Sequence, residues 1–293
     1  MSRSVGPAAL ATRLPLFLSA VRLQETIFAL PFAYTGMVLA AEGLPTWHQF
    51  GWITTAMVGA RTLGMAANRL IDHHIDARNP RTSGRHLPTG ALASADVAVL
   101  AAVAAAVFVF AASRLNGLAL ALSPVAGAYL IAYPYTKRFT WATNLLLGWA
   151  LAIAPAGAWI GVRGSLDWEI VLLSLAVASW AGGFDILYHV QDRDFYIGAG
   201  LHSVAQRFSV VAAFWMARAL DLVAVAALVA LGVWLGLAFP YFIGCAIAAA
   251  LMVYKYRIVT PADISRMGLA FMRINAYVST TMLVSTLIAV LMD

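Results

Sequence analysis

The stretch LASADVAVLAAVAAAVFVFAAS, residues 92–113, contains a single charged side chain, that of Asp96. A helix needs about 20 apolar residues to cross the hydrocarbon core of a membrane, and this run has that length. The whole chain has the same character, because 62% of its 293 residues are hydrophobic, 11% are charged and the mean hydropathy is +0.82. A soluble domain carries about 25% charged residues, so the composition excludes a soluble enzyme and predicts a membrane protein.

Further apolar windows lie on both sides of this one and predict an all-α, polytopic membrane protein. We expect nine transmembrane helices arranged as a bundle around a central cavity. The expected spans are residues 14–41, 47–71, 92–113, 116–133, 142–162, 168–190, 208–236, 239–257 and 267–291. They predict one transmembrane domain over residues 1–293. The second and sixth spans both end in acids, and the fourth and eighth both end in aromatic and basic residues. This echo predicts two pseudo-repeat halves, residues 14–138 and 139–257, plus a ninth helix.

The lysines and arginines predict how the bundle is oriented. If the spans alternate, twelve of these residues lie on the side of the N-terminus and two, Arg114 and Arg163, lie in the opposite loops. Positively charged loops stay in the cytoplasm, so we expect the N-terminus on the cytoplasmic side of the cell membrane, with the lipid bilayer as a partner. The net charge of +6 is spread along the apolar runs and forms no continuous basic domain, so no nucleic-acid partner is expected.

Two short segments at the inner ends of the second and sixth spans concentrate the acids. The first, NRLIDHHIDARNPRTSGR (residues 68–85), spaces Asn68, Asp72 and Asp76 four apart. The second, FDILYHVQDRDFYIGAGLHSVAQRF (residues 184–208), repeats Asp185, Tyr188, Asp192 and Tyr196 at steps of three and four. Residues three or four apart lie on one face of a helix, so each set is expected to project in one direction.

These acids predict a divalent-cation site. An acid at the bilayer centre costs about 2.5–3.5 kcal/mol, and carboxylates four residues apart repel unless a cation lies between them. Carboxylate and amide oxygens suit Mg²⁺, which binds through a few carboxylates plus the phosphates of a substrate, so a phosphorylated ligand is expected. The expected metal ligands are Asn68, Asp72, Asp76, Asp185 and Asp192. Alternatively, both segments are solvated helix ends whose acids pair with neighbouring arginines; two aligned clusters on one side of the membrane favour the site.

Basic residues in the same inner loops are candidate phosphate ligands. They are Arg81, Arg85, Lys137 and Arg138. An arginine binds phosphate as a two-pronged fork and a lysine as a point charge. For each residue alone, the alternative is that it only sets the topology.

At these two motifs the sequence resembles the UbiA superfamily of intramembrane prenyltransferases. In that family N-x-x-x-D-x-x-x-D and D-x-x-Y-x-x-x-D-x-x-x-D motifs face each other in an all-helical bundle and bind a prenyl diphosphate through Mg²⁺. The segments FALPFAY, YPYTKRFT, NPRTSGRHLPTG and GLHSVAQRF extend the resemblance along the chain. Together they look most like the 4-hydroxybenzoate polyprenyltransferase group, including its relatives in menaquinone formation.

The resemblance implies roles for particular residues. Asp72, Asp185 and Asp192 would be catalytic, and Arg22 and Tyr133 would contact the acceptor. Arg22 has an alternative role as an interfacial residue or a partner of Glu25.

One position departs from the family pattern. Tyr196 stands where the last aspartate of the second motif is expected, which leaves Asp185 and Asp192, or Asp194 on a neighbouring face, to complete the ligand set. A phenol with a pKa of about 10 is a poor Mg²⁺ ligand, so Tyr196, like Tyr188, is expected to hydrogen-bond the diphosphate.

The implied reaction transfers a polyprenyl group from its diphosphate to a small aromatic acceptor such as 4-hydroxybenzoate, in respiratory quinone synthesis. A dihydroxynaphthoate or another lipid-quinone precursor is the alternative acceptor. A cation-coupled transporter is the alternative from another class. It predicts acids in the middle of spans, whereas Asp72, Asp76, Asp192 and Asp194 lie at inner ends.

Overall fold

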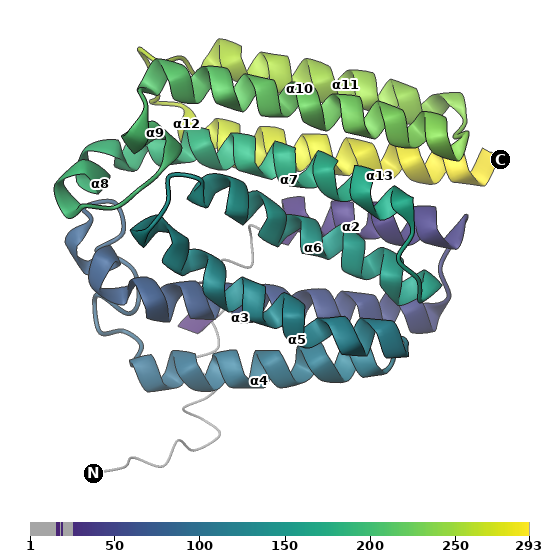
Figure 1. The fold of residues 1–293 in the computed structure, drawn as a ribbon, viewed down its shortest axis with the longest axis horizontal. Coiled ribbons are helices and arrows are strands. Elements are labelled where there is room, and N and C mark those ends of the chain that lie inside the picture. Colours follow the sequence, from purple (N-terminus) through teal and green to yellow (C-terminus); the bar gives the residue numbers. More distant parts are fainter. Residues whose placement is uncertain (1–15, 18, 20–25, 293) are drawn as a thin grey trace.

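The computed structural model describes residues 16, 17, 19 and 26–292, and long helices running alongside one another dominate this part of the chain (Figure 1). The long helices are α2 (Thr26–Ala41), α3 (Trp47–Arg78), α4 (Ser94–Ser113), α5 (Gly117–Ala132), α6 (Thr143–Arg163), α7 (Trp168–His189), α10 (Val210–Leu235), α11 (Phe239–Ile258) and α13 (Asn275–Met292). The short elements are the 3₁₀ helices η2 (Tyr133–Arg138) and η3 (Val190–Asp192), the α-helices α8 (Arg193–Ala199), α9 (Val204–Arg207) and α12 (Met267–Leu269), and the π-helix η4 (Ala270–Ile274). The predicted all-α class is therefore confirmed.

Seven helices in the described residues are long and apolar enough to cross a membrane, so the predicted count of nine spans is not confirmed. The seven segments are Ser94–Ser113, Gly117–Arg138, Thr143–Arg163, Trp168–Ala199, Val210–Leu235, Phe239–Ile258 and Met267–Met292. The difference lies in the first two expected spans. Helix α3 has 32 residues but carries many polar and charged side chains, and the apolar part of α2 is short.

The long helices form a closed ring. From α2 to α7 and on through α10, α11 and α13, each long helix packs against the next one in the chain. Helix α13 then returns to α2, and α2 also packs against α6 across the interior. The apolar segment that begins with α7, Trp168–Ala199, is the most enclosed of the seven at 78% buried, whereas the segments of α4 and α5 are each 22% buried. Helices α6 and α7 lie in the middle of the assembly in Figure 1, with α4 at one edge.

The close approach of α6 and α7 depends on Gly148. A Cβ atom at this position would lie 2.2 Å from the carbonyl oxygen of Ala178 and 2.9 Å from the backbone nitrogen of Gly182. Both are backbone atoms of α7 and cannot rotate away. The two helices are therefore held at a distance that only glycine permits.

Replacing Gly148 by alanine is expected to push α6 and α7 apart. Overpacking of this kind costs about 1–3 kcal/mol, so we expect Gly148→Ala to lower the thermal midpoint of the detergent-solubilised protein. Gly157→Ala is the matched control, because Gly157 lies on the same helix and a Cβ there would meet nothing within 4 Å. Equal midpoints for the two variants would contradict the close contact.

A buried ion pair joins α10 to α11. The Nζ atom of Lys255 lies 2.8 Å from Oδ2 of Asp221, and the hydroxyl of Tyr256 donates to the same oxygen at 2.6 Å. Lys255 is 1% exposed and Asp221 5% exposed. Each charge is thus removed from water and depends on the other.

Candidate functional site

A polar pocket of about 170 Å³ lies at the end of the bundle where α3 and α7 finish. Its polar lining residues are Asn68, Arg69, Asp72, Asp76, Asn79, Arg81, Thr82, Arg85, Tyr133, Lys137, Thr143, Asp185, Tyr188, His189, Asp192 and Tyr196. Helices far apart in the sequence therefore bring the two acidic segments to one place. The acids lie in a shared pocket rather than on separate helix ends.

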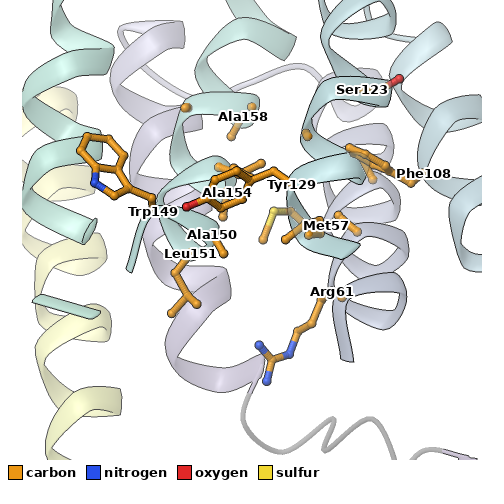
Figure 2. Close-up of a pocket in the computed structure, with 18 of the residues that line it drawn as sticks. Met57, Arg61, Phe108, Ser123, Tyr129, Trp149, Ala150, Leu151, Ala154 and Ala158 are labelled. Carbon is orange, nitrogen blue, oxygen red and sulfur yellow. The ribbon is translucent and has the colours of Figure 1, made fainter. Parts of the chain in front are cut away.

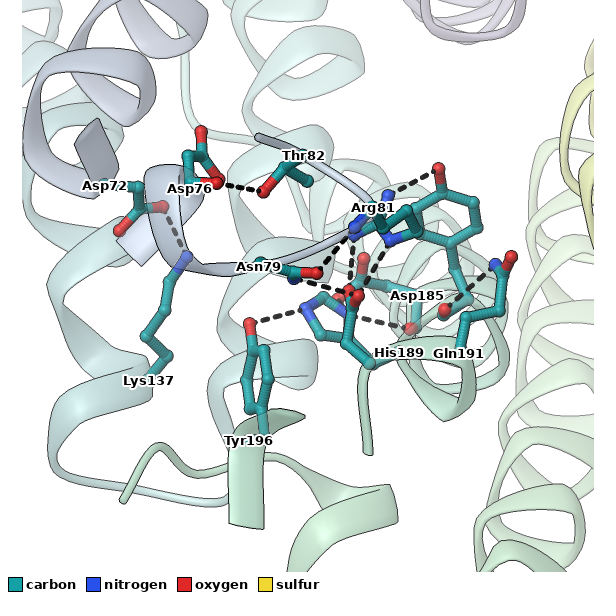
Figure 3. A network of polar contacts seen from close by, with 12 residues as sticks. Asp72, Asp76, Asn79, Arg81, Thr82, Lys137, Asp185, His189, Gln191 and Tyr196 are labelled. Atoms are coloured by element: carbon teal, nitrogen blue, oxygen red, sulfur yellow. Dashed lines mark hydrogen bonds and ion pairs between the residues drawn. The ribbon is translucent and has the colours of Figure 1, made fainter. Parts of the chain in front are cut away.

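The α3 half of the pocket contains Asp72 and Asp76, which are 2% and 6% exposed. Lys137 donates from Nζ to Oδ2 of Asp72 (Figure 3). Nδ2 of Asn68 donates to the same oxygen at 3.1 Å. Nη1 of Arg85 donates to both oxygens of Asp76, at 2.7 and 2.6 Å. Each acid of this half is therefore paired with a basic side chain.

Pro80 directs the loop that follows α3 across the pocket. The residue before a proline is disfavoured in the helical region, and Asn79 is extended, with φ −86° and ψ 118°. Helix α3 therefore ends at Arg78, and the next residues reach the second motif on α7 and η3.

In the half of the pocket formed by α7 and η3, the guanidinium of Arg81 binds the carboxylate of Asp192. Its Nε atom donates to Oδ1 at 2.8 Å, and its Nη2 atom donates to Oδ2. Nδ2 of Asn79 adds a hydrogen bond to Oδ1 at 3.0 Å. Nη1 of Arg81 also donates to the hydroxyl of Tyr188 at 3.0 Å, and the guanidinium lies 4.9 Å from that ring's centre. Both oxygens of Asp192 are thus occupied.

Asn144 on α6 connects three parts of the site. Its Nδ2 atom donates to Oδ2 of Asp185 at 2.8 Å and lies 3.1 Å from Nδ1 of His189. Its Oδ1 atom accepts from the backbone N–H of Val204 at 3.1 Å, which fixes the orientation of the amide. His189 in turn places Nε2 3.1 Å from the hydroxyl of Tyr196. The chain from Asn144 through His189 therefore holds Tyr196 in the pocket.

The pocket is balanced between acids and bases. Burial alone would lower the pKa of Arg81, but its hydrogen bond to Asp192 and the charge of Asp192 together raise that pKa above its ordinary value. Among the described residues, no three His, Cys, Asp or Glu side chains converge as a metal cage. Mg²⁺ rarely uses such a cage and binds through one or two carboxylates plus substrate phosphates, so the oxygen donors of this pocket fit Mg²⁺.

An apolar cavity of about 690 Å³ adjoins the polar pocket and runs between α3, α4, α5 and α6 (Figure 2). Both spaces are lined by Met65, Tyr133, Leu147 and Asp185. Arg61 is the only basic residue that lines the apolar cavity in the described part of the chain, and Figure 2 shows its side chain extending away from the cluster of labelled apolar residues. A ligand with a charged head and an apolar tail would fit the two spaces together.

Most residues expected from the sequence line the polar pocket, with three exceptions. Arg138 does not line it; its Nη2 atom donates to the carbonyl of Ile71 at 2.8 Å and lies 3.5 Å from Oδ1 of Asp72. The side chain of Asp194 is 98% exposed and also lies outside the pocket lining, whereas Tyr196 lines it. Arg22 lies outside the described residues.

Sequence reasoning missed several polar residues of the site. Five of them line the pocket, namely Arg69, Asn79, Thr82, Thr143 and His189, and Asn144 contacts Asp185 from α6. His189 stands four residues after Asp185, a spacing that places both on one helical face and was available in the sequence. Asn79 stands directly before Pro80, where a side chain leaving the helix was to be expected. Nothing in the sequence near Asn144 indicates its contact with α7, because that contact joins different helices.

Comparison with known proteins agrees with this architecture. The model of the UbiA prenyltransferase family matches residues 29–277. The 4-hydroxybenzoate octaprenyltransferase of Aromatoleum aromaticum is 32% identical over 289 residues, which cover 97% of each chain. A solved apo structure of a UbiA homologue from Aeropyrum pernix K1 superposes with a TM-score of 0.78 at 29% identity, covering 92% of this chain and 97% of that one.

A second solved structure shares the fold at lower identity. It is a UbiA homologue from Archaeoglobus fulgidus bound to DMAPP and Mg²⁺, with a TM-score of 0.61 at 16% identity over 91% of this chain and 98% of that one. The apolar helices and the family match together show that this chain is an intramembrane transferase. It belongs to the UbiA prenyltransferase family, and membership excludes the transporter alternative.

Proposed function

We propose that the protein transfers a polyprenyl group from polyprenyl diphosphate to a small aromatic acceptor such as 4-hydroxybenzoate. The observation that carries this proposal is that the two spaces adjoin and share four lining residues, Met65, Tyr133, Leu147 and Asp185. A diphosphate fits the polar pocket, whose lining includes several cations, and a prenyl chain fits the apolar cavity. The relative from Aromatoleum aromaticum carries the same activity in its name.

The residues of the polar pocket would bind the donor's diphosphate. Asn68, Asp72 and Asp76 would hold a divalent cation, and Lys137 and Arg85 would contact phosphate oxygens. When bound, the cation supplies positive charge that stabilises the departing diphosphate. Tyr188 and Tyr196 would donate hydrogen bonds to the same group, and Arg138 would support the pocket through its contacts with Asp72 and Ile71.

The chemical step is an electrophilic aromatic substitution. The allylic C–O bond breaks and the diphosphate leaves with its electron pair. A ring carbon ortho to the acceptor's hydroxyl forms the new C–C bond, and the ring then loses a proton. Asp185 lines both spaces and is therefore the residue proposed to accept that proton. The apolar lining excludes water, which would otherwise capture the allylic cation.

Arg61 and Tyr133 are the proposed contacts for the acceptor. Arg61 lines the apolar cavity and stands seven residues, or about two helical turns, before Asn68 on α3. Tyr133 lines both spaces. A guanidinium beside the donor's tail suits an acceptor that combines an aromatic ring with a carboxylate.

Replacing Arg61 by methionine tests this contact. A hydrogen bond to a charged group contributes about 1.5–3 kcal/mol, so Arg61→Met is expected to raise the KM for an acceptor carboxylate by about 10- to 100-fold. The KM for the donor should stay within a factor of about two. Arg61→Lys retains the charge and should lose less. An unchanged acceptor KM in the methionine variant would rule out the contact.

We also propose that the polar pocket opens toward the cytoplasm in the cell membrane. The segments that join α3 to α4, α5 to α6 and α7 to α10 at this end contain Arg81, Arg85, Lys137, Arg138, Arg193 and Arg207, whereas Arg114 and Arg163 lie at the other ends of their helices. Such loops remain cytoplasmic. Cysteines introduced at Ser83 and Gly200 should therefore be protected from a reagent added outside the cell, whereas one at Gly164 should be labelled. The opposite pattern would contradict this orientation.

The direct test is an assay with purified protein, Mg²⁺, a polyprenyl diphosphate and a panel of acceptors, with products identified by mass spectrometry. The panel contains 4-hydroxybenzoate, a dihydroxynaphthoate, a porphyrin and a glycerol phosphate. A prenylated hydroxybenzoate supports the proposal. A prenylated dihydroxynaphthoate would support aromatic prenyl transfer but would show that the acceptor is the alternative one. Product from the glycerol phosphate alone would overturn the aromatic assignment.

A further inference from the structure

The four acids of the polar pocket are paired with bases in two different ways. On the α3 side, Asp72 is contacted by Nζ of Lys137 and, at 3.5 Å, by Nη2 of Arg138. Asp76 is contacted by Nη1 of Arg85 and, at 3.9 Å, by Nη1 of Arg69, so each base on this side uses a single nitrogen. An ammonium on a flexible stem is a point charge that moves readily to another oxygen. Because no base on this side forms a two-nitrogen fork, these pairs can exchange when a cation and a diphosphate arrive.

On the α7 side, the pair between Arg81 and Asp192 is held from several directions. The guanidinium uses two nitrogens on the two oxygens of Asp192, a fork geometry that is stronger and more specific than a single contact. The backbone N–H of Arg81 donates to Oδ1 of Asn79 at 3.0 Å, and the side chain also contacts the hydroxyl and ring of Tyr188. Freeing Asp192 for a metal would break this entire network.

On the α7 side, the other acid that lines the pocket, Asp185, already has partners, and the next position of the motif carries no carboxylate. Four residues further on stands Tyr196, which is 4% exposed and whose hydroxyl lies 3.1 Å from Nε2 of His189. A phenol is a poor ligand for Mg²⁺. Oδ2 of Asp185 is already engaged by Asn144 at 2.8 Å and lies 3.2 Å from Nδ1 of His189.

The α3 side has the opposite character. Asp72 and Asp76 are four residues apart on one helix, where like charges repel and a cation between them is favourable. Asn68 adds an amide one turn earlier on the same face.

From this asymmetry we propose that the divalent cation is held on the α3 side alone, by Asn68, Asp72 and Asp76. Arg81 permanently occupies Asp192 and supplies the positive charge on the α7 side. Tyr196, positioned by His189, contributes a hydrogen bond there instead of a metal ligand. The inference deepens the proposed function and rests on it, since the cation is taken to accompany a prenyl diphosphate. It revises the expectation that Asp185 and Asp192 are metal ligands.

The test counts Mn²⁺ bound to the full-length protein by electron paramagnetic resonance, in the presence of a prenyl thiolodiphosphate that cannot react. Asp72→Asn is expected to weaken Mn²⁺ binding by about 10- to 100-fold, the scale for loss of one hydrogen bond or ligand contact to a charged group. Asp192→Asn, a change of the same size and charge, should leave Mn²⁺ binding unchanged. If the loss in Asp192→Asn comes within fivefold of the loss in Asp72→Asn, the proposal is overturned.

A second variant keeps the test decisive should Asp192→Asn fail to fold. Arg81→Gln retains the carboxylate of Asp192 but removes its fork, so the number of Mn²⁺ ions bound per protein should rise above that of the wild type. An unchanged number would show that Arg81 does not withhold Asp192 and would overturn the inference. Failure of the wild type to bind the thiolodiphosphate at all would instead refute the proposed function.

Discussion

Asp72→Asn is expected to lower kcat for prenyl transfer by about 10²–10³-fold, the range for removing one preorganised electrostatic contact from a transition state. Asp72 is 2% exposed and accepts hydrogen bonds from Lys137 and Asn68, so its charge is central to the α3 half of the pocket. The substitution keeps the shape of the side chain. The protein should therefore fold, and initial rates of product formation at saturating donor measure the loss.

The control for this prediction is Asp194→Asn. Asp194 is also an acid of the second segment, but its side chain is 98% exposed and lies outside the pocket lining, with Arg193 at 3.5 Å. Its rate should equal that of the wild type. Near-normal turnover in Asp72→Asn would contradict the hypothesis that a metal in this pocket assists the reaction. Full activity of the wild type in EDTA would contradict it as well.

Lys255→Met should reduce the free energy of unfolding by about 3–5 kcal/mol, because it leaves the buried carboxylate of Asp221 without its cation. The partner atoms lie 2.8 Å apart and neither residue is more than 5% exposed. The change in the free energy of unfolding is measured by titrating the detergent-solubilised protein with a denaturing detergent. This pair does not line either cavity, so the effect should appear in stability.

A double variant distinguishes loss of charge balance from loss of packing. Replacing both partners, as Lys255→Met with Asp221→Leu, removes the unpaired charge and should recover much of the lost stability. If the double variant is as unstable as Lys255→Met alone, packing rather than charge explains the defect.

The sequence predicted the fold class well because membrane helices are set by local composition. The span expected over residues 168–190 corresponds closely to α7, Trp168–His189. The sequence predicted α3 less well, because the polar residues of the first motif continue that helix to Arg78 and lower its hydropathy. A hydropathy window ends where polar side chains begin, whereas the helix ends where Pro80 follows.

For the pocket, helical spacing identified the acids but not their partners. Asp72 and Asp76 are related by sequence distance, so their common face was predictable. The contact of Asn144 with Asp185 spans 41 residues and depends on the close packing of α6 on α7 at Gly148. The engagement of Arg81 with Asp192 spans 111 residues and depends on the course of the loop after α3. Such contacts arise from the packing of distant elements and have no local periodic signal.

In the proposed site, the exchangeable pairs of Asp72 and Asp76 would make the binding of the metal and of the donor cooperative. Lys137 and Arg85 are paired with Asp72 and Asp76, and a cation bound by those two acids would free both bases to contact phosphate oxygens. Because the ion pairs have to be separated only once, the two ligands share the free-energy cost of separating them. By thermodynamic reciprocity, each ligand must increase the affinity of the protein for the other by the same factor.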